Sequence, residues 1–480
     1  TPLYSSAASD VYKRQNLRLK YPNGQKKIFD NLSIQIKDKE KVLLLGPSGS
    51  GKSTLLNVLS GIVPNLIDLP LKYDALEVDP SSGVIFQDPD TQFCMPKVYE
   101  ELAFVLENQQ VPREEMDHRI EEALMTVGLN VDKNQYINEL SGGMKQKLAI
   151  AETILQQATT LFLDEPTAML DVESTADLWQ KIQSLWRDQT VLIVEHKVEH
   201  IWQHVDRVVL MNYDGAIIAD APPSQILNYY EALLTEYGVW HPKAWHSAPK
   251  ALNFSDSDSS HFNFQIQDAV IKRGKQQLIN IPKLNVNAGE WISITGSNGS
   301  GKTSLLESMM QLIKYEGQMY INHHIYTKIK SAAKSMYLVY QNPELQFITN
   351  SVYDEIHIQN KNKFNSTDEA KQQTESLLKT LNLTSVQIQH PYELSMGQKR
   401  RLSVAIALSA SSDLILLDEP TFGLDSHNTF NLIKLFQQRI KQGQTIIMVT
   451  HDPEIIARYP TRRLHLEHHH LIEKTGDTYV

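Results

Sequence analysis

The segment GPSGSGKST occupies residues 46–54 of the chain, and GSNGSGKTS repeats its pattern at residues 296–304. Both copies fit G-x-x-x-x-G-K-[ST], which forms a phosphate-binding loop when a buried strand precedes it and a helix follows. The apolar run KVLLLG leads into the first copy, and KSTLLNVLSG then has the apolar spacing of a helix. The sequence therefore predicts two loops whose backbone N–H groups surround phosphates at a helix N-terminus.

Each loop supplies side chains with separate expected roles. Lys52 and Lys302 are expected to reach the β- and γ-phosphates, and Ser53 and Thr303 to ligate Mg²⁺. The nucleotide-binding candidates in the two loops are Gly46, Gly49, Gly51, Lys52, Ser53, Thr54, Gly296, Gly299, Gly301, Lys302, Thr303 and Ser304.

Two further motifs show that a whole domain is duplicated. FLDEPTAMLD (162–171) recurs as LLDEPTFGLD (416–425), and LSGGMKQ (140–146) recurs as LSMGQKR (394–400). From the serine of the LS motif to the aspartate of DEP there are 23 residues in both halves. From that aspartate to a later histidine there are 32 residues in the first half and 33 in the second. Because order and spacing agree, the chain is expected to contain two tandem domains.

The DEP motif ends an apolar strand with two acids in each half. In parallel sheets the nucleotide binds at the carboxyl ends of the strands, where these acids would lie. Asp164 and Asp418 are expected to hold Mg²⁺. Glu165 and Glu419 are placed to polarise the attacking water and are catalytic candidates.

Glutamines and histidines follow other strands of the two halves. Gln87 ends GVIFQ and Gln341 ends MYLVYQ, and each could sense Mg²⁺ and the γ-phosphate. His196 and His451 end VLIVEH and TIIMVTH, and their recurring distance from DEP favours a γ-phosphate contact and a catalytic role. The expected Mg²⁺ ligands are Ser53, Gln87, Asp164, Thr303, Gln341 and Asp418.

Composition limits the class of protein. The 480 residues carry a formal net charge of −10, which argues against nucleic-acid binding, where basic faces supply most of the affinity. The single cysteine, Cys94, cannot form an internal disulfide and fits a reducing compartment. No apolar run approaches the roughly 18–20 residues of a membrane-spanning helix. A role in a membrane process would therefore be exerted from outside the bilayer.

The expected domain organisation follows from these patterns. Residues 1–15 (TPLYSSAASDVYKRQ) resemble translated adapter sequence, lack the apolar region of a secretory signal and are interpreted as a non-native segment. The first domain is placed at residues 16–238, a Ser/Asp-rich linker at 239–261 and the second domain at 262–480. Apolar strands separated by helices predict an α/β fold with parallel sheets covered on both faces.

Together these motifs resemble the ATP-binding cassette (ABC) ATPase family over nearly all of residues 16–480, twice. The resemblance implies two tandem P-loop NTPase domains, each a mainly parallel sheet flanked by helices with an antiparallel β portion and a helical subdomain. In that family two cassettes meet head to tail, and each ATP lies between the P-loop of one and the LSGGQ motif of the other. The implied contacts are Ser395 and Gly397 at the first site, and Ser141 and Gly143 at the second.

The resemblance also predicts how adenine is bound. The family stacks adenine on an aromatic residue about 25 residues before the first P-loop glycine, and Tyr21 has this distance from Gly46. Ile271 stands at the same offset in the second half. Since stacking contributes about 1 kcal/mol, weaker adenine binding is expected there, unless Phe262 or Phe264 substitutes.

The loops that contain Gln87 and Gln341 indicate which group within the ABC family the chain resembles. FQDPDTQF (86–93) and YQNPELQF (340–347) share a pattern similar to that of energy-coupling factor (ECF) importers, with second glutamines at Gln92 and Gln346. In that family this region grips a helix of a transmembrane subunit. The resemblance implies ATP and Mg²⁺ as cofactors, integral membrane and substrate-capture subunits as partners, no nucleic acid, and a location at the cytoplasmic face of the membrane. A fused pair of this size resembles the thiamine or hydroxymethylpyrimidine type.

Other interpretations stay open at this point. A non-transport tandem ABC ATPase acting on ribosomes or DNA is the alternative function. The ribosomal type carries a charged helical linker and an LSGGE motif, and the DNA-repair type carries zinc modules that one cysteine cannot form. The cluster His468–His470 is expected to be a solvated hairpin turn rather than a metal site. Met396 replaces a motif glycine, but no positive φ is expected there.

Overall fold

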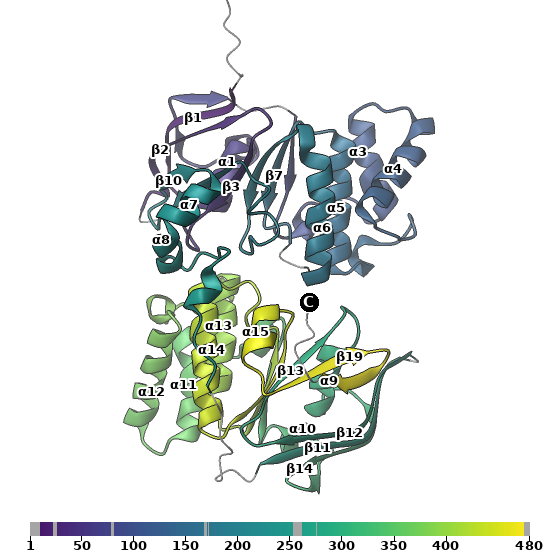
Figure 1. Ribbon diagram of the computed structural model, residues 1–480, viewed down its shortest axis with the longest axis vertical. Helices are drawn as coiled ribbons and strands as arrows, with labels where there is room; N and C mark the ends of the chain where they lie inside the picture. Colours follow the sequence, from purple (N-terminus) through teal and green to yellow (C-terminus); the bar gives the residue numbers. More distant parts are fainter. Residues whose placement is uncertain are drawn as a thin grey trace, which may run out of the picture. The chain divides into compact units, whose positions relative to one another are not determined.

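The computed structural model describes residues 10–22, 26–77, 81–167, 170, 172–252, 262–274 and 276–474. The chain divides into two compact units, residues 1–247 and residues 248–480, each an α/β domain (Figure 1). Among the described residues, no helix combines the length and the apolar character needed to span a membrane.

The first unit is built around a mixed six-stranded sheet. Its neighbouring strands are parallel except for the last pair, β10 and β9, which is antiparallel. The strand order is β10 (Ile217–Ala221), β9 (Arg207–Met211), β3 (Lys41–Leu45), β8 (Thr190–Val194), β7 (Thr160–Asp164) and β6 (Ser82–Ile85). Both faces are buried, since Val42 and Leu43 of β3 belong to different hydrophobic clusters on opposite sides.

An antiparallel sheet covers one side of this unit. It contains β2 (Phe29–Lys37), β1 (Asp10–Leu19), β4 (Leu71–Lys72) and β5 (Ala75–Glu77). Residues 10–15, set aside in the sequence analysis, form the beginning of β1 and pair with β2 and β5. Residues 1–9 lie outside the described part of the chain.

The helices of the first unit fall into two groups. Three of them form the helical subdomain that the family resemblance implied, and Figure 1 shows these three together at one side of the unit: α3 (Val98–Asn108), α4 (Arg113–Val127) and α5 (Gly142–Gln156). The others are α1 (Lys52–Leu59), α2 (Ile62–Asn65), α6 (Val172–Leu185), α7 (Pro223–Tyr229) and α8 (Glu231–Glu236).

The second unit repeats this plan with one change in its sheets. All ten of its described strands join in one sheet, because β20 pairs with both β12 and β19. Their order is β15 (His324–Ile325), β14 (Tyr315–Ile321), β11 (Asn263–Arg273), β12 (Gln276–Asn287), β20 (His470–Glu473), β19 (Arg462–Glu467), β13 (Trp291–Gly296), β18 (Thr445–Val449), β17 (Leu414–Asp418) and β16 (Met336–Val339).

The helices of the second unit follow the order of the first. They are α9 (Lys302–Met309), α10 (Ile329–Ala332), α11 (Val352–Lys363), α12 (Thr367–Thr380), α13 (Met396–Ser409), α14 (Ser426–Lys441) and α15 (Pro453–Arg458). The antiparallel β portion implied by the resemblance is present here as β11, β12, β14 and β15. The turn between β19 and β20 contains His468 and His469 in left-handed conformations, which confirms the expected hairpin turn.

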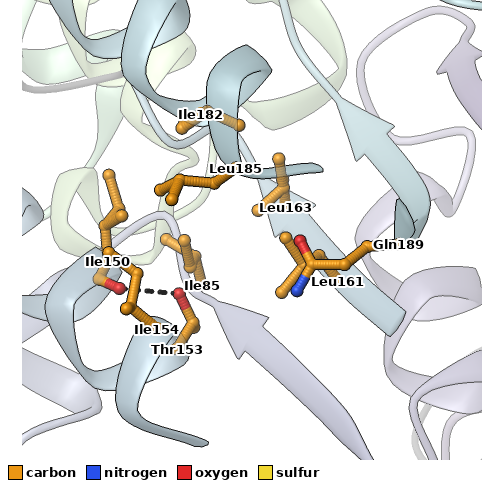
Figure 2. Close-up of a pocket in the computed structure, with 9 residues that line it drawn as sticks. All are labelled: Ile85, Ile150, Thr153, Ile154, Leu161, Leu163, Ile182, Leu185 and Gln189. Atoms are coloured by element: carbon orange, nitrogen blue, oxygen red, sulfur yellow. Dashed lines mark hydrogen bonds between the residues drawn. The ribbon is translucent and has the colours of Figure 1, made fainter. Parts of the chain in front are cut away.

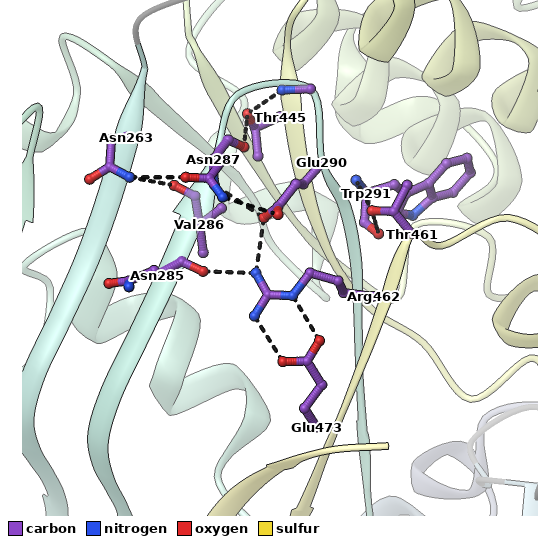
Figure 3. A network of polar contacts seen from close by, with 11 residues as sticks. Asn263, Asn285, Val286, Asn287, Glu290, Trp291, Thr445, Thr461, Arg462 and Glu473 are labelled. Atoms are coloured by element: carbon purple, nitrogen blue, oxygen red, sulfur yellow. Dashed lines mark hydrogen bonds and ion pairs between the residues drawn. The ribbon is translucent and has the colours of Figure 1, made fainter. Parts of the chain in front are cut away.

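Arg462 of β19 connects neighbouring parts of the sheet in the second unit (Figure 3). Arg462 of β19 donates to the backbone oxygen of Asn285 at 2.8 Å and pairs with Glu290 at 3.0 Å and Glu473 at 2.9 Å. These contacts join β19 to β12, to the turn after it and to β20.

The first unit contains the same arrangement, with an aspartate in place of one of the two glutamates. Arg207 of β9 donates to the backbone oxygen of Gln35 at 2.5 Å and lies 3.2 Å from Glu40 and 3.5 Å from Asp220. The repeated arginine cluster shows that the duplication extends to the polar contacts that hold the sheets.

Residues 239–247, assigned to the linker from the sequence, pack against the first unit. Trp240 is buried and its ring lies 5.5 Å from that of Trp245. His241 contacts Thr235 at 3.1 Å, which attaches the segment to the end of α8. The Ser/Asp-rich remainder, residues 253–261, lies outside the described residues.

Candidate active site

Each P-loop depends on a glycine at the end of a central strand. Gly46 and Gly296 have φ of 155° and 147°. A Cβ at Gly46 would lie 2.8 Å from the backbone oxygen of Met211, and one at Gly296 would lie 2.7 Å from that of Leu466. Only glycine fits such a close backbone approach. The remaining loop glycines with positive φ are Gly49, Gly51, Gly299 and Gly301.

The P-loop lysines lie inside their loops. Lys52 Nζ donates to the backbone oxygens of Gly46 and Pro47 at 2.8 and 3.0 Å. Lys302 Nζ donates to the corresponding oxygens of the second loop, at 2.7 and 2.9 Å. Both lysines begin a helix, α1 and α9, so each ammonium group lies within a loop whose backbone curves around it.

A hydroxyl and a carboxylate meet beside each P-loop. Ser53 Oγ donates to Asp164 at 3.0 Å, and Thr303 Oγ1 donates to Asp418 at 2.6 Å. Burial, together with the charge of Glu165, raises the pKa of Asp164 to about 6. Burial also raises the pKa of Asp418. Paired oxygen ligands of this kind suit Mg²⁺, so these residues fit the expected cation.

The catalytic candidates Glu165 and Glu419 share an unusual backbone conformation. Their φ values of 49° and 50° lie in the left-handed region, which is uncommon outside glycine and asparagine. The amide of Glu165 donates to the backbone oxygen of Val194 at 2.8 Å, and that of Glu419 to Val449 at 3.0 Å. The neighbouring strand therefore holds each glutamate in place.

The first unit brings its predicted residues together around Glu165. His196 Nε2 lies 3.0 Å from one carboxylate oxygen, and Gln87 Nε2 donates to the other at 2.7 Å. Burial alone would raise the pKa of Glu165, but the charges of His196 and Lys52 outweigh it and lower that pKa. Burial would lower the pKa of His196, but the charge of Glu165 outweighs it and raises that pKa. The two side chains therefore favour an ion pair.

In the second unit the histidine and the glutamate lie farther apart. His451 Nε2 lies 3.6 Å from Glu419 Oε1. Gln341 contributes its backbone oxygen, which accepts a hydrogen bond of 2.6 Å from Arg400.

Arg400 is a residue near the site that the sequence analysis did not select. It is 4% exposed, and its charge acts on Asp418 and Glu419. Arg400 is the seventh residue of LSMGQKR, and Gln146 takes this position in LSGGMKQ. A buried cation thus stands beside the second pair of acids where the first unit has a neutral side chain. The only signal in the sequence was this one difference between the two copies.

The LS motifs begin the long helices of the helical subdomains. Ser141 caps α5 by accepting a bond from the amide of Met144, and Ser395 caps α13 through Gln398. The Gln398 side chain bonds back to the Ser395 amide at 2.9 Å, completing a capping box. Met396 is the first residue of α13, which confirms that no positive φ is required there.

The two LS-motif glycines differ in their surroundings. A Cβ at Gly143 would lie 2.8 Å from Leu170, whereas one at Gly397 would lie 3.7 Å from Leu424. The space beside Gly143 is therefore tighter than that beside Gly397. The expectation that these motifs act on the ATP of the opposite domain stays a prediction.

The adenine candidates occupy very different positions. Tyr21 is 40% exposed, and its hydroxyl lies 2.9 Å from Thr54 Oγ1 at the start of α1. Ile271 is fully buried in β11. Phe262 and Phe264 are also buried, so neither can replace Tyr21 as a face for the base, and that interpretation was wrong.

Both domains match the family model described as ABC transporter, over residues 29–168 and 279–422. The chain belongs to the ABC transporter family. A Bacillus subtilis protein named "Putative HMP/thiamine import ATP-binding protein YkoD" is 31% identical, covering 94% of this chain and 89% of that protein. A "Putative ABC transporter ATP-binding protein" of Methanosarcina mazei is 29% identical, covering 93% and 86%.

Solved structures support the tandem fold. The archaeal ribosome recycling factor aABCE1, in complex with the ribosomal stalk protein aP1, has a TM-score of 0.65 and 21% identity, covering 94% of this chain and 87% of that one. At this identity the likeness shows the fold alone. The chain is thus a tandem ABC ATPase, and ABC domains of this family bind ATP, generally with Mg²⁺.

A cavity elsewhere in the first ABC domain is unsuited to nucleotide. It measures about 170 Å³ and lies among β6, β7, α5 and α6 (Figure 2). Its lining is aliphatic except for Thr153 and Gln189, and Thr153 Oγ1 is already bonded to the backbone oxygen of Ile150 at 2.8 Å. With no charged group in its lining, the cavity is a gap in the core.

Proposed function

We propose that this tandem ABC ATPase is the energising subunit of an importer whose membrane-spanning and substrate-capture subunits are separate chains. Its cargo would be a small nutrient, a vitamin or vitamin precursor such as thiamine or hydroxymethylpyrimidine. The name of the Bacillus subtilis relative supports this cargo class. The observation that carries the proposal is a loop, repeated in both domains, that follows the glutamine of each site and leads in the second domain to an exposed apolar surface.

The loop after each glutamine has the same construction in both domains. Asp88 accepts a hydrogen bond from the amide of Asp90, and Asn342 accepts one from that of Glu344, both at 3.0 Å. Asp90 then pairs with Lys145 of α5 at 2.5 Å, and Glu344 pairs in the same way with a lysine of α13. A movement of the loop would therefore be transmitted to the helix that begins at the LS motif.

The second glutamine of each loop fixes the loop to the same helix. Gln92 Nε2 donates to Glu152 at 2.6 Å, and Gln346 Nε2 donates to the backbone oxygen of Ser403 at 3.0 Å. Both acceptors lie in the middle of the LS-motif helix, α5 or α13. These contacts give the second glutamines a structural role as anchors of the loop.

A buried acid closes the far end of each loop. Glu101 of α3 accepts the amide of Cys94 at 2.9 Å, and Glu355 of α11 accepts the amide of Thr349 at 2.6 Å. Both acids are almost fully buried. The loop is thus held at both ends, and its middle part remains at the surface.

In the second domain this surface is apolar. Leu345, Ile348, Ile388 and Tyr392 are 68%, 75%, 85% and 51% exposed. Tyr392 is attached to the loop by a bond from its hydroxyl to the backbone oxygen of Glu344. An exposed apolar group of this kind indicates an interaction with an apolar partner, for which a helix of a membrane subunit is suited.

The first domain is more polar at the same positions. Thr91, Cys94, Asn134 and Asn138 correspond to the four apolar residues, since the backbone pairing around α3 repeats that around α11. The membrane partner would therefore present a more apolar segment to the second domain than to the first.

Within each domain the side chains have distinct parts in hydrolysis. Bound ATP with Mg²⁺ supplies the phosphoryl group to be transferred to water. Glu165 and Glu419 would orient and polarise that water, and His196 and His451 would hold the glutamates and reach the γ-phosphate.

Purification of the tagged full-length chain from native membranes would test the proposal. We expect a stoichiometric integral membrane protein to accompany it and to stimulate ATP hydrolysis. Leu345→Asp should weaken this association strongly, while Thr91→Asp, the matched change in the first domain, should weaken it less. Co-sedimentation with ribosomes or binding to DNA, without a membrane partner, would contradict the importer role and support the alternative function.

A further inference from the structure

The β-hairpins that precede the two P-loops can be aligned by their packing. Phe29 of β2 lies against Gly51, because a Cβ on that glycine would be 3.0 Å from the ring. Ile279 of β12 lies in the same way against Gly301, at 3.1 Å. Phe29 and Ile279 are also the same distance in sequence from the first glycine of their loops. They are therefore equivalent residues.

The strand partners of these two residues reveal a difference in hairpin length. Leu19 is the partner in the first hairpin and Ile271 in the second. Nine residues separate the first pair, whereas seven separate the second. Tyr21, two residues beyond Leu19, thus corresponds to Arg273 and not to Ile271. A fixed offset from the P-loop selects the wrong residue because the second hairpin is two residues shorter.

Arg273 is the last residue of β11, and this strand lies against the P-loop helix α9. Tyr21 contacts Thr54 of α1. Glu307 lies one turn along α9 from the position equivalent to Thr54. Burial and the charge of Asp418 raise the pKa of Glu307, and the charge of Arg273 opposes them. The Arg273 side chain itself is exposed at the end of β11.

We propose that Arg273 is the adenine platform of the second nucleotide site, lying against the face of the base as Tyr21 would in the first. A guanidinium is planar and stacks on aromatic rings, with a cation–π attraction added. The proposal rests on ATP binding by the second ABC domain and not on the importer role.

The two sites would then recognise adenine by different means. The first offers an aromatic ring whose hydroxyl is held by Thr54. The second offers the planar, charged side chain of an exposed arginine. The weaker adenine binding expected from Ile271 is replaced by binding that depends on Arg273.

The test uses the full-length chain with Lys52→Ala, so that only the second site binds tightly. Affinities for Mg·ATP and for Mg·tripolyphosphate, which lacks the base, are measured by isothermal titration. We expect Arg273→Ala to weaken ATP binding about threefold to tenfold, from the strength of cation–π contacts. Arg273→Lys should weaken it similarly, because lysine has no planar face, and Arg273→Tyr should restore it. Tripolyphosphate binding should stay the same throughout.

Lys272→Ala is the matched control, since it removes a neighbouring charge that pairs with Glu316 of β14. It should leave both affinities unchanged, and thermal unfolding verifies that each variant is folded. Full ATP affinity in Arg273→Ala or in Arg273→Lys would overturn the proposal. An equal loss of tripolyphosphate binding would also overturn it, because Arg273 would then act on phosphate. These results are independent of the membrane-partner experiment.

Discussion

Glu152 provides a sharp test of the packing beneath the glutamine loop of the first domain. It is 3% exposed in α5, and Gln92 donates to its carboxylate at 2.6 Å. Burial raises the pKa of Glu152 from 4.5 to about 8, and the bond from Gln92 offsets this only in part. The equivalent residue of α13 is Ile406. The two domains therefore differ by one ionisable group at the same place.

The sign of the pH dependence follows from the raised pKa. Between pH 4.5 and pH 8 the unfolded chain has lost this proton while the folded domain retains it. The folded state then binds more protons, so stability falls as the pH rises through this window. Each pH unit corresponds to about 1.4 kcal/mol for one proton. From pH 5.5 to pH 7.5 the group alone should lower the free energy of unfolding of the first domain by at most roughly 3 kcal/mol.

Glu152→Gln removes this titration and keeps the shape of the side chain. Urea unfolding is monitored by hydrogen–deuterium exchange. Peptides from α5 report on the first domain, and peptides from α13 report on the second. The variant should gain stability over the wild type in α5, and the gain should be larger at pH 7.5 than at pH 5.5. The α13 peptides should not change. An equal gain at both pH values, or no gain, would refute the reasoning.

Three further predictions concern catalysis, capping and the sheet. Glu165→Gln combined with Glu419→Gln should lower ATP hydrolysis by about 10²–10⁴-fold while retaining ATP binding; rapid phosphate release by the double variant would contradict the assigned roles. Met144→Gln allows the capping box seen at Gln398 and should stabilise α5 by about 0.5–1 kcal/mol in urea unfolding; an unchanged midpoint would argue against it. Arg462→Ala should destabilise the second domain by about 2 kcal/mol, with Arg462→Lys recovering little, because lysine cannot bond two acids and a carbonyl at once.

Much of the fold and of the site could be predicted because each motif stands beside the strand or helix that it requires. The P-loops, the acid pairs and the alternation of apolar strands with helices are local signals, and they recur at fixed spacing. The meeting of Ser53 with Asp164, or of Glu165 with His196, follows from parallel strands that end at one edge of a sheet. These residues could therefore be named without coordinates.

The features that the sequence did not predict depend on three-dimensional contacts, which the spacing of motifs does not reveal. The equivalence of Tyr21 and Arg273 requires the pairing across each hairpin, since a shortened loop shifts every offset. The importance of Arg400 appears only when its burial beside two acids is known. Residues 239–247 lie on the first domain because His241 and Lys243 contact residues of α8, and no spacing in the sequence shows these contacts.

The left-handed backbone conformation of Glu165 places two neighbouring acids in different surroundings. Asp164 and Glu165 are adjacent in sequence, yet the turn of the backbone at Glu165 directs one toward Ser53 and the other toward His196. One carboxylate has a raised pKa and the other a lowered one, although a single peptide bond separates them. A backbone held away from its preferred conformation can thus give two identical functional groups opposite chemical characters. Any substitution that relaxed this turn should make the pKa values of the two carboxylates more alike.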